Sequence, residues 1–308
     1  MSDKFYVNSF WSSISSDLFA GDKIKDFNNF KRDINCKISL FDPNKNGIRY
    51  LKTLICVLAS TMSEYEKKIH SNIHHISVGN PYSILTDSGL TLDLDYYQSI
   101  VEASFVSQCF DFFGKNILEI GAGYGRTCHT LMSNFDINSY TIMDLDEMLN
   151  LSKSYLKSVL PEDRFAKINF IGIDADVASL KFDLAINIDS FAEMNADVVY
   201  NYMEFINHSS DYFYVKNPVG KYLDQTLDNH FRGQEVVQQA LAIGILTQIL
   251  NIDDAKEVSL NAKLFCNAYT PSADWDIVDS SWAKPFSYYW QALYKKRRCG
   301  TDVYENRI

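Results

Sequence analysis

The sequence predicts an α/β fold: a seven-stranded, mostly parallel sheet with an antiparallel hairpin at one edge, preceded by a helical N-terminal extension. From residue 116 onward, short apolar runs alternate with segments of helical periodicity, which is typical of βαβ units. A glycine-rich turn at residues 121–125 separates the first apolar run from the helix after it. Residues 1–110 instead have mainly the 3.6-residue periodicity of helices. We therefore predict a helical region over residues 1–110 and an α/β domain over residues 111–308.

The composition is that of a globular protein without a membrane span. The chain has 308 residues, 46% hydrophobic and 22% charged, enough for one large domain or two modest ones. A net charge of −10 argues against a nucleic-acid partner, because a phosphate backbone requires a clustered basic surface. No apolar window reaches eighteen residues, and MSDKFYVNSFW at the N-terminus lacks the layout of a signal peptide. Six cysteines without a CxxC pair predict reduced thiols and a cytoplasmic location.

The N-terminal region is predicted to contain three helices, near residues 10–19, 48–70 and 94–113. The segment HISVGNPYSILTDSGLTLDLD, residues 75–95, is rich in turn residues and reads as a loop. We expect this region to act as a lid on the acceptor side of a ligand cleft. Tyr82 in this segment could hold a sugar ring, but core packing would explain this residue equally well.

The predicted sheet follows in chain order. Its strands are expected at residues 116–120, 139–144, 168–173, 182–188, 211–217, 262–269 and 286–296. Helices are expected between them and after the fifth strand, at residues 124–135, 145–160, 196–208 and 234–250. The last two strands are separated by a turn-rich loop at residues 270–285, so we predict that they form the antiparallel edge hairpin.

The glycine turn predicts a nucleotide-type ligand. Its residues, Gly121-Ala122-Gly123-Tyr124-Gly125, let the backbone approach a ligand, and the following helix offers unpaired N–H groups. A dinucleotide fingerprint would read G-x-G-x-x-G, but here Arg126 stands where the third glycine belongs. Glu119, two residues before the turn, would repel a pyrophosphate and suits a cationic amino group, such as that of S-adenosylmethionine (SAM).

A ribose-binding acid is expected about 20 residues past the glycines, at the end of the second strand. Asp144 stands there and is followed by Leu145, and we interpret Asp146 as a helix N-cap. After the third strand, Asp174-Ala175-Asp176 either contacts an adenine amine or forms a solvated loop. We also expect Asn187, near the end of the fourth strand, at the cofactor site.

Several segments resemble a family of bacterial sugar O-methyltransferases from surface-glycan gene clusters, which belongs to the class I SAM-dependent methyltransferases. The resemblance lies in LEIGAGYGR (118–126), TIMDLDEML (141–149), LAINIDSFAEMNADVVYNYM (184–203), YFYVKNP (212–218) and WQALYKK (290–296). It implies a Rossmann-like methyltransferase fold, SAM as cofactor, and methylation of a sugar hydroxyl in polysaccharide biosynthesis. The implied acceptor is a sugar, a nucleotide sugar or a glycan. Residues 1–80 are not covered by the resemblance.

Ligands of open α/β sheets bind outside the carboxyl ends of the strands. Asp189, Ser190, Glu193 and Met194 follow the fourth strand and are expected beside the reacting centre. Asp189 and Glu193 are candidates for the general base that takes the hydroxyl proton, and His230 is a more distant one. Each has a structural alternative: a turn cap for Asp189, bonds to loop N–H groups for Glu193, and a surface position for His230. No metal-ligand spacing stands out, so we expect a metal-independent reaction, although Asp189 and a neighbouring acid could bind Mg²⁺.

Two other functions stay open from the sequence. One is an NAD(P)-dependent oxidoreductase with a Rossmann domain, against which Glu119 and the missing third glycine argue. The other is a SAM-binding partner subunit without catalysis, because no single residue identifies itself as the catalyst. An oligomeric protein is also compatible with the sequence.

Overall fold

The computed structural model describes residues 43–175, 177, 179–222 and 234–297. The chain separates into two compact units, Met1–Val57 and Leu58–Ile308. The described part of the first unit belongs to α3 (Pro43–Ser60), and everything from α4 onward belongs to the second. The predicted division near residue 110 stays a prediction, and the helix predicted near residues 10–19 lies outside the described residues.

The single helix predicted over residues 48–70 is wrong, because the chain forms two helices there. α3 ends at Ser60, and α4 (Glu64–Ser71) begins after Ser63. The Ser63 side chain accepts a hydrogen bond from the Glu66 backbone N–H, and the Glu66 carboxylate accepts one from the Ser63 N–H. This reciprocal capping box satisfies two N–H groups that a new helix would otherwise leave unpaired.

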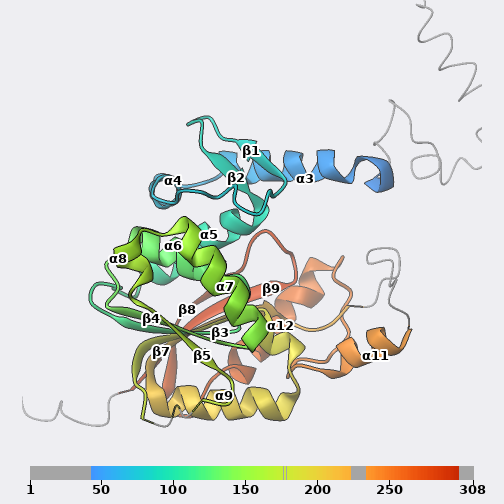
Figure 1. The fold of residues 1–308 in the computed structure, drawn as a ribbon. Helices are drawn as coiled ribbons and strands as arrows, with labels where there is room; N and C mark the ends of the chain where they lie inside the picture. The colour runs from blue at the N-terminus through green and yellow to red at the C-terminus, as the bar shows by residue number, and fades with distance from the viewer. Residues whose placement is uncertain (1–42, 176, 178, 223–233, 298–308) are drawn as a thin grey trace, which may run out of the picture. The chain divides into compact units, whose positions relative to one another are not determined.

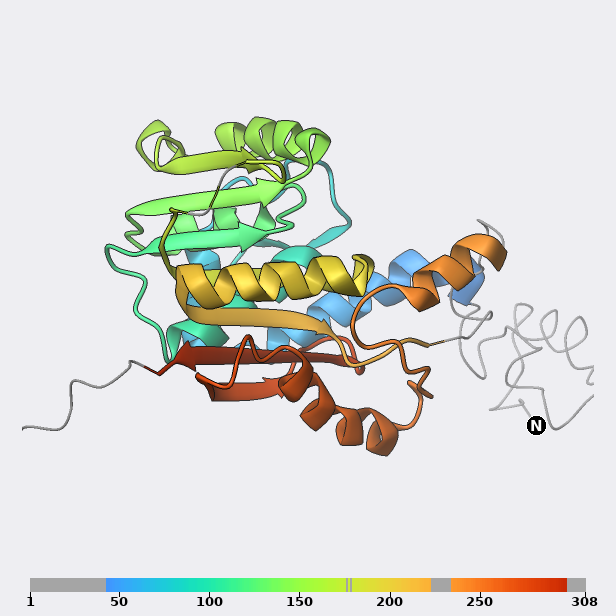
Figure 2. The same cartoon turned by 90° about the horizontal axis from the view of Figure 1, so that it is seen from below.

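The second unit is built on a seven-stranded sheet with the order β5-β4-β3-β6-β7-β9-β8 (Figure 1). Its strands are β3 (Asn116–Ile120), β4 (Ser139–Asp144), β5 (Ile168–Gly172), β6 (Phe182–Ile188), β7 (Ser210–Pro218), β8 (Trp275–Trp282) and β9 (Tyr289–Lys296). Strands β3 to β7 pair in parallel, and β9 runs antiparallel to both β7 and β8 (Figure 2). The predicted fold class is confirmed: a mostly parallel seven-stranded sheet closed by an antiparallel hairpin.

Helices cover both faces of the sheet (Figures 1 and 2). One face carries α5 (Leu94–Ser107), α6 (Arg126–Asn134) and α7 (Asp146–Val159), and α7 is followed by the short α8 (Glu162–Phe165). The other face carries α9 (Ala196–Ser209) and α12 (Ala255–Ala268). The short 3₁₀ helix η2 (Ser190–Glu193) connects β6 to α9, and α11 (Gln234–Ala242) is shorter than the helix predicted over residues 234–250. The predicted loop at residues 75–95 contains a small hairpin, β1 (Ser83–Leu85) with β2 (Thr91–Asp93).

The strand predicted at residues 262–269 is wrong, because these residues form the second half of α12. The helix begins after Asp254, whose carboxylate accepts hydrogen bonds from the N–H groups of Lys256 and Glu257. Its buried positions recur at helical spacing: Val258, Asn261, Ala262, Phe265 and Cys266. The edge hairpin exists, but its first strand is β8, within the stretch predicted as a loop. Most β8 residues are exposed or half-buried, which weakens the alternation that identifies a strand.

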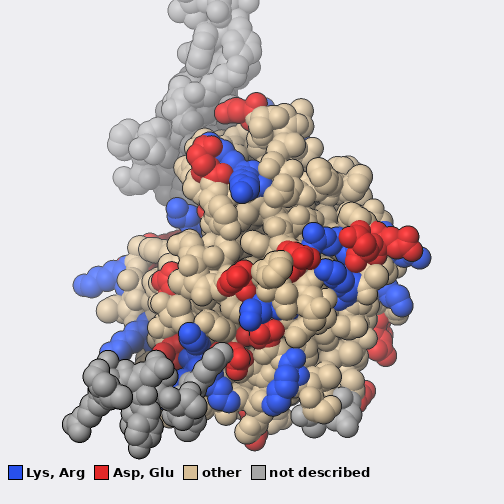
Figure 3. All heavy atoms as spheres, turned by 90° about the vertical axis from the view of Figure 1, so that its left-hand side faces the viewer, with Lys and Arg blue, Asp and Glu red and all other residues tan. Residues whose placement is uncertain are grey.

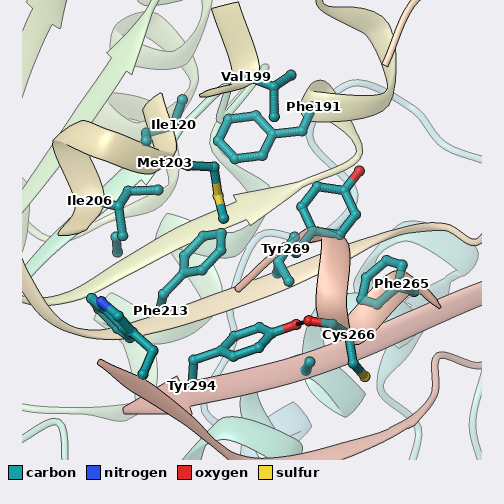
Figure 4. Close-up of a cluster of buried hydrophobic side chains, with 14 of the residues drawn as sticks. Ile120, Phe191, Val199, Met203, Ile206, Phe213, Phe265, Cys266, Tyr269 and Tyr294 are labelled. Atoms are coloured by element: carbon teal, nitrogen blue, oxygen red, sulfur yellow. Dashed lines mark hydrogen bonds between the residues drawn. The ribbon is translucent and has the colours of Figure 1, made fainter. Parts of the chain in front are cut away.

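The core on the α9 and α12 face is aromatic. Phe191 of η2 lies against Phe213 and Tyr269, with ring centroids 6.4 Å and 6.3 Å away (Figure 4). Tyr294 stacks on Phe213, and its hydroxyl donates to the backbone oxygen of Cys266 at 2.8 Å (Figure 4). Because Phe191 belongs to η2, this core fixes the segment that follows β6 at the edge of the sheet.

The surface carries charges of both signs. Figure 3 shows acidic and basic side chains interspersed on the side at the left of Figure 1, where the parallel strands begin. Within the described ranges, the helices are too short or too polar to cross a bilayer.

Candidate functional site

Two cavities adjoin the turn that follows β3, at the carboxyl ends of the parallel strands. The first has a volume of about 240 Å³ and is called the acidic cavity because Asp95, Glu119, Asp189 and Glu193 line it. The second has a volume of about 540 Å³ and is called the apolar cavity. It is lined by Ile120, Met143, Asp144, Leu145, Met148, Ile173, Met194, Val198 and Tyr202. Both cavities are bordered by Gly121, Gly123, Ser190 and Glu193. The two cavities therefore form one groove along the carboxyl ends of the parallel strands.

Each of the three glycines of the turn has a positive φ, and the surroundings that a side chain would meet differ among them. Gly121 has φ +74°, and a Cβ there would lie 2.2 Å from Ser190 Oγ. Gly125 has φ +95°, and a Cβ there would lie 2.9 Å from Leu156 on α7. Gly121 therefore lets β3 approach η2, and Gly125 lets α6 approach α7.

Gly123 also has a positive φ, +58°, but no protein atom lies within 4 Å of the position a Cβ would take. This open space borders both cavities. A small residue at this position leaves room for a ligand to pass close to the backbone. Ala122 and Tyr124, the other predicted residues of the turn, line the acidic cavity.

Asp144 ends β4 and holds the glycine turn. One carboxylate oxygen accepts the N–H of Gly123 at 2.9 Å, and the other accepts the N–H of Leu145 at 2.8 Å. A carboxylate has about four lone-pair sites, so acceptor capacity remains for a ligand in the apolar cavity. Asp144 and Leu145 both line that cavity, and their contact with a ribose stays a prediction. Asp146 is exposed and is the first residue of α7, with Leu145 at the N-cap, so its predicted N-cap role is off by one residue.

Glu119 lies at the opposite end of the groove and is 2% exposed. It accepts a hydrogen bond from the Tyr140 hydroxyl at 2.8 Å. Burial raises the pKa of Glu119 to about 7, although Tyr140 and Arg126 both favour the charged form. The carboxyl is therefore poised to ionise near neutral pH, and a cationic ligand group in the acidic cavity would favour its ionised form.

Arg126 lines the acidic cavity, but its guanidinium is already engaged by Glu102 of α5, with N–O distances of 3.1 Å and 3.0 Å. Lys216 of β7 donates to the same carboxylate at 2.8 Å and to Gln98 Oε1 at 2.8 Å. Burial opposes ionisation of Glu102, but Arg126 and Lys216 outweigh it and lower the pKa of this carboxyl. This network (Glu102, Arg126, Lys216) joins α5, the first residue of α6 and β7. Lys216 is therefore committed to the interior and is not available to face an acceptor.

Asn187 of β6 is fully buried and lines neither cavity. Its amide nitrogen donates to Ile120 O at 3.1 Å and to Ser190 Oγ at 2.6 Å, and its oxygen accepts from Asn217 at 2.9 Å. The Asn217 oxygen accepts the N–H of Ala192 at 3.2 Å. Asn187, predicted as a cofactor contact, and Asn217 fix η2 to the strand ends instead.

Asp189, the residue after β6, has a strained backbone, with φ +65° and ψ −39°. Such a conformation costs of order 1–3 kcal/mol for a residue other than glycine and is most often found at functional sites. Its Oδ1 atom is buried, with no hydrogen-bond partner among the described residues. Burial raises the pKa of Asp189, against the opposing effects of Lys216 and Arg126. Asp189 faces the acidic cavity and is a stronger base than an exposed aspartate would be.

Glu193, the second candidate base, is exposed at the end of η2 and borders both cavities. Asp174 and Ala175 lie in an exposed turn after β5 and line neither cavity, whereas their neighbour Ile173 lines the apolar one. His230 and Asp176 lie outside the described residues. The groove therefore unites Glu119, the glycine turn, Arg126, Asp144, Leu145, Asp189 and Glu193, and does not include Asn187, Asp174 or Ala175.

Several groove residues were missed by the sequence analysis. Asp95 lies in the first turn of α5 and accepts from the Tyr124 hydroxyl at 3.4 Å. Val198 and Tyr202, one helical turn apart on α9, line the apolar cavity, and no motif marks them. Glu102, which lines neither cavity but holds Arg126, could have been found from the sequence, because it is a charged residue within a helix that is buried along most of its length. Over the part of the chain that the structure describes, no group of three or more His, Cys, Asp or Glu side chains could hold a metal ion.

Comparisons with known proteins show similarity to solved structures only; neither a family profile nor a curated protein matches the sequence. The chain is similar to the methyltransferase domain of bacterial CtHen1, with 12% identity, 67% of this chain and 100% of that one covered, and a TM-score of 0.46. It is similar to magnesium protoporphyrin IX methyltransferase from Synechocystis PCC 6803, with 15% identity, 65% and 84% coverage, and a TM-score of 0.43. Mitomycin 7-O-methyltransferase MmcR matches at 13% identity with a TM-score of 0.42, over 64% of this chain and 54% of that chain. At such identities the reaction and the acceptor must be argued from the groove itself.

Proposed function

We propose that the protein is a SAM-dependent O-methyltransferase that acts on a sugar hydroxyl. The observation that carries the proposal is the groove itself, which has Asp144 at its apolar end, Glu119 at its acidic end and the open position of Gly123 between them. SAM has a nucleoside at one end and an amino acid at the other, so it matches this division.

The apolar cavity suits the adenosine part. Asp144 would accept hydrogen bonds from the ribose hydroxyls, and Met143, Ile173 and Tyr202 would pack against the adenine. The half-buried Tyr202 lies on α9, across the cavity from the β4 residues. The predicted contacts at Asp174 and Ala175 are not part of this arrangement.

The acidic cavity suits the cationic part. Glu119 would pair with the amino group of SAM, and the free N–H groups at the start of α6 would face the carboxylate of SAM. A dinucleotide would bring a pyrophosphate to this same turn, beside Glu119. The acid therefore favours SAM over NAD(P).

When bound, SAM would supply the methyl group of an in-line displacement at carbon. Asp189 lies on the same cavity and would accept the proton of the acceptor hydroxyl as oxygen attacks. Its raised pKa and its unpartnered Oδ1 support this role. Exposed Glu193 borders the groove and would orient the acceptor. The remaining contribution is alignment of the hydroxyl with the methyl group, which is worth ~7–11 kcal/mol in well-oriented systems.

The sugar acceptor, the role in surface-glycan biosynthesis and the cytoplasmic location rest on the sequence resemblance. A polyol acceptor also fits a groove rich in carboxylates, which accept hydroxyl hydrogen bonds. The N-terminal region would cover the acceptor side.

Calorimetry of the full chain with SAM, S-adenosylhomocysteine and NAD tests the cofactor. We expect the first two to bind and NAD not to bind. Transfer of labelled methyl groups from SAM to methyl glycosides of glucose, galactose, mannose, rhamnose and fucose, and to their nucleotide-linked forms, tests the acceptor. SAM binding without transfer to any of these would favour a non-catalytic SAM-binding subunit, and binding of NAD alone would overturn the proposal.

A further inference from the structure

Arg126 alone is positively charged among the described residues that line the acidic cavity, where Asp95, Glu119, Asp189 and Glu193 supply carboxylates. A guanidinium stays charged at any pH that a protein meets. The cavity has a volume of only about 240 Å³, so a guanidinium that turned into it would pair with one of these carboxylates. It would then repel a cationic ligand group. Binding of such a group therefore depends on where Arg126 is held.

Helix α5 holds the Arg126 guanidinium at the cavity wall. The Nη2 atom lies 3.1 Å and 3.0 Å from the two carboxylate oxygens of Glu102, and the Nη1 atom donates to the Asp95 backbone oxygen at 3.3 Å. The side chains of Arg126 and Glu102 are 12% and 4% exposed, so salt screens their attraction little. The buried Lys216 donates to the same carboxylate at 2.8 Å. Two cations therefore share the single acid Glu102.

Helix α5 is itself fixed to α6, so Glu102 has a defined position. Ser99 Oγ and Thr130 Oγ1 are 2.7 Å apart, and the Tyr96 hydroxyl lies 2.6 Å from His129 Nδ1. These four side chains are buried. Separating the helices would leave buried polar groups without partners, which is costly. Glu102 is therefore a rigid anchor for the guanidinium.

We propose that Glu102 is a positioning residue that makes the groove selective for a cationic ligand: by holding Arg126 at the wall, it leaves the carboxylates of the acidic cavity free for the charged end of SAM. Glu102 lines neither cavity, so it acts through Arg126 and not through contact with the ligand. The inference rests on the proposed function and adds a determinant of its cofactor selectivity.

The proposal is tested by comparing SAM with S-adenosylhomocysteine, which lacks the methyl group and the positive charge on sulfur. The ratio of Kd for S-adenosylhomocysteine to Kd for SAM measures how strongly the groove favours that charge. Glu102→Gln keeps the shape of the side chain but frees the guanidinium, so calorimetry should show this ratio falling about fivefold or more. Partial unfolding would raise both Kd values by the same factor, so the ratio remains informative in a destabilised variant.

Asp183→Asn is the matched control. It removes the acid of a half-buried pair with Lys115 at the start of β6, the end of this strand away from the groove, and should leave the ratio unchanged. An unchanged ratio in Glu102→Gln would overturn the role of Glu102.

Arg126→Gln, made in the wild type and in Glu102→Gln, separates release of the guanidinium from simple loss of a negative charge. In the wild type we expect the ratio to change less than about twofold, because the guanidinium is already held. In Glu102→Gln the same substitution should restore the ratio to near the wild-type value, since the double variant and the wild-type network have the same net charge. An equal effect in the two backgrounds, or a larger one in the wild type, would overturn the proposal. Failure of the wild-type chain to bind either compound would instead contradict the proposed function.

Discussion

The carboxylate of Asp144 accepts a hydrogen bond from the backbone N–H of Gly123 at 2.9 Å. The end of β4 therefore fixes the position of the glycine turn. The same carboxylate borders the apolar cavity, so one side chain both shapes the groove and would bind the ribose of a ligand in it.

Replacing Asp144 is expected to weaken SAM binding. Asp144→Ala removes two ribose hydrogen bonds and the tie to the turn. Hydrogen bonds to charged groups are worth about 1.5–3 kcal/mol, so Kd should rise at least tenfold. Calorimetry with S-adenosylhomocysteine measures this. Asp146→Ala, two residues further on and exposed, is the control and should bind normally. Equal losses in the two variants would contradict the assignment of the ribose to Asp144.

SAM affinity should rise with pH through the titration of Glu119. Its pKa of about 7 means that the buried carboxyl is largely neutral at pH 6 and largely ionised at pH 8. Only the ionised form pairs with an ammonium group. We expect Kd to fall by up to about tenfold between pH 6 and pH 7.5. Glu119→Gln should remove this pH dependence of Kd and leave only the smaller one due to the ligand's own amino group. An equal pH dependence of Kd in the wild type and the variant would rule out Glu119 as the titrating group.

The same carboxyl should affect stability in the opposite direction. Glu119 holds its proton more tightly in the folded chain than in the unfolded one, since its pKa is raised. Its contribution to the free energy of unfolding therefore falls as pH rises from about 4.3 to about 7. Glu119→Gln should be more stable than the wild type at pH 8 and lose this advantage at pH 4.5. Urea denaturation at the two pH values measures the difference.

Substitution of Gly121 should mainly reduce stability, whereas substitution of Gly123 should mainly prevent SAM binding. Gly121→Ala creates a contact with Ser190 at a positive φ and should cost roughly 2–4 kcal/mol of stability. Gly123→Ala meets no protein atom, so it should cost only the backbone strain of about 1–2 kcal/mol but abolish SAM binding. Gly89→Ala, at a positive φ in the β1–β2 turn with open space around it, is the matched control and should bind SAM. Normal SAM affinity in Gly123→Ala would mean that no ligand passes this position.

Removing the shared acid of the buried network should destabilise the fold. Glu102→Gln leaves the buried cations Arg126 and Lys216 without their counter-charge, which costs roughly 3–5 kcal/mol in comparable buried pairs. Because the pKa of Glu102 is lowered in the folded chain, the wild type should lose this contribution only as pH falls below about 4. Chemical denaturation at pH 7 and pH 3 measures both effects. Glu64→Gln, which breaks an exposed pair with Lys67, should leave stability unchanged.

Local sequence patterns were sufficient to predict most strands of the sheet. β3, β4 and β6 were predicted to the residue, because a parallel strand covered on both faces is a continuous apolar run bounded by turns. The glycine turn was also readable, since a positive φ demands glycine whatever surrounds it. The edge hairpin was placed wrongly, because β8 is half exposed and α12 supplied the apolar residues that its strand was expected to have.

The sequence by itself determined the α/β class, the turn at residues 121–125 and the acids Glu119 and Asp144, since each follows from spacing along one stretch of chain. Only the tertiary structure decided which side chains enter the groove. Asn187 and Lys216 are polar residues at strand ends, yet their hydrogen bonds are made with Ser190, Asn217, Gln98 and Glu102. Asp95 and Tyr202 reach the groove from distant segments. Whether a polar side chain meets a ligand depends on partners far along the chain, and local sequence carries no record of them.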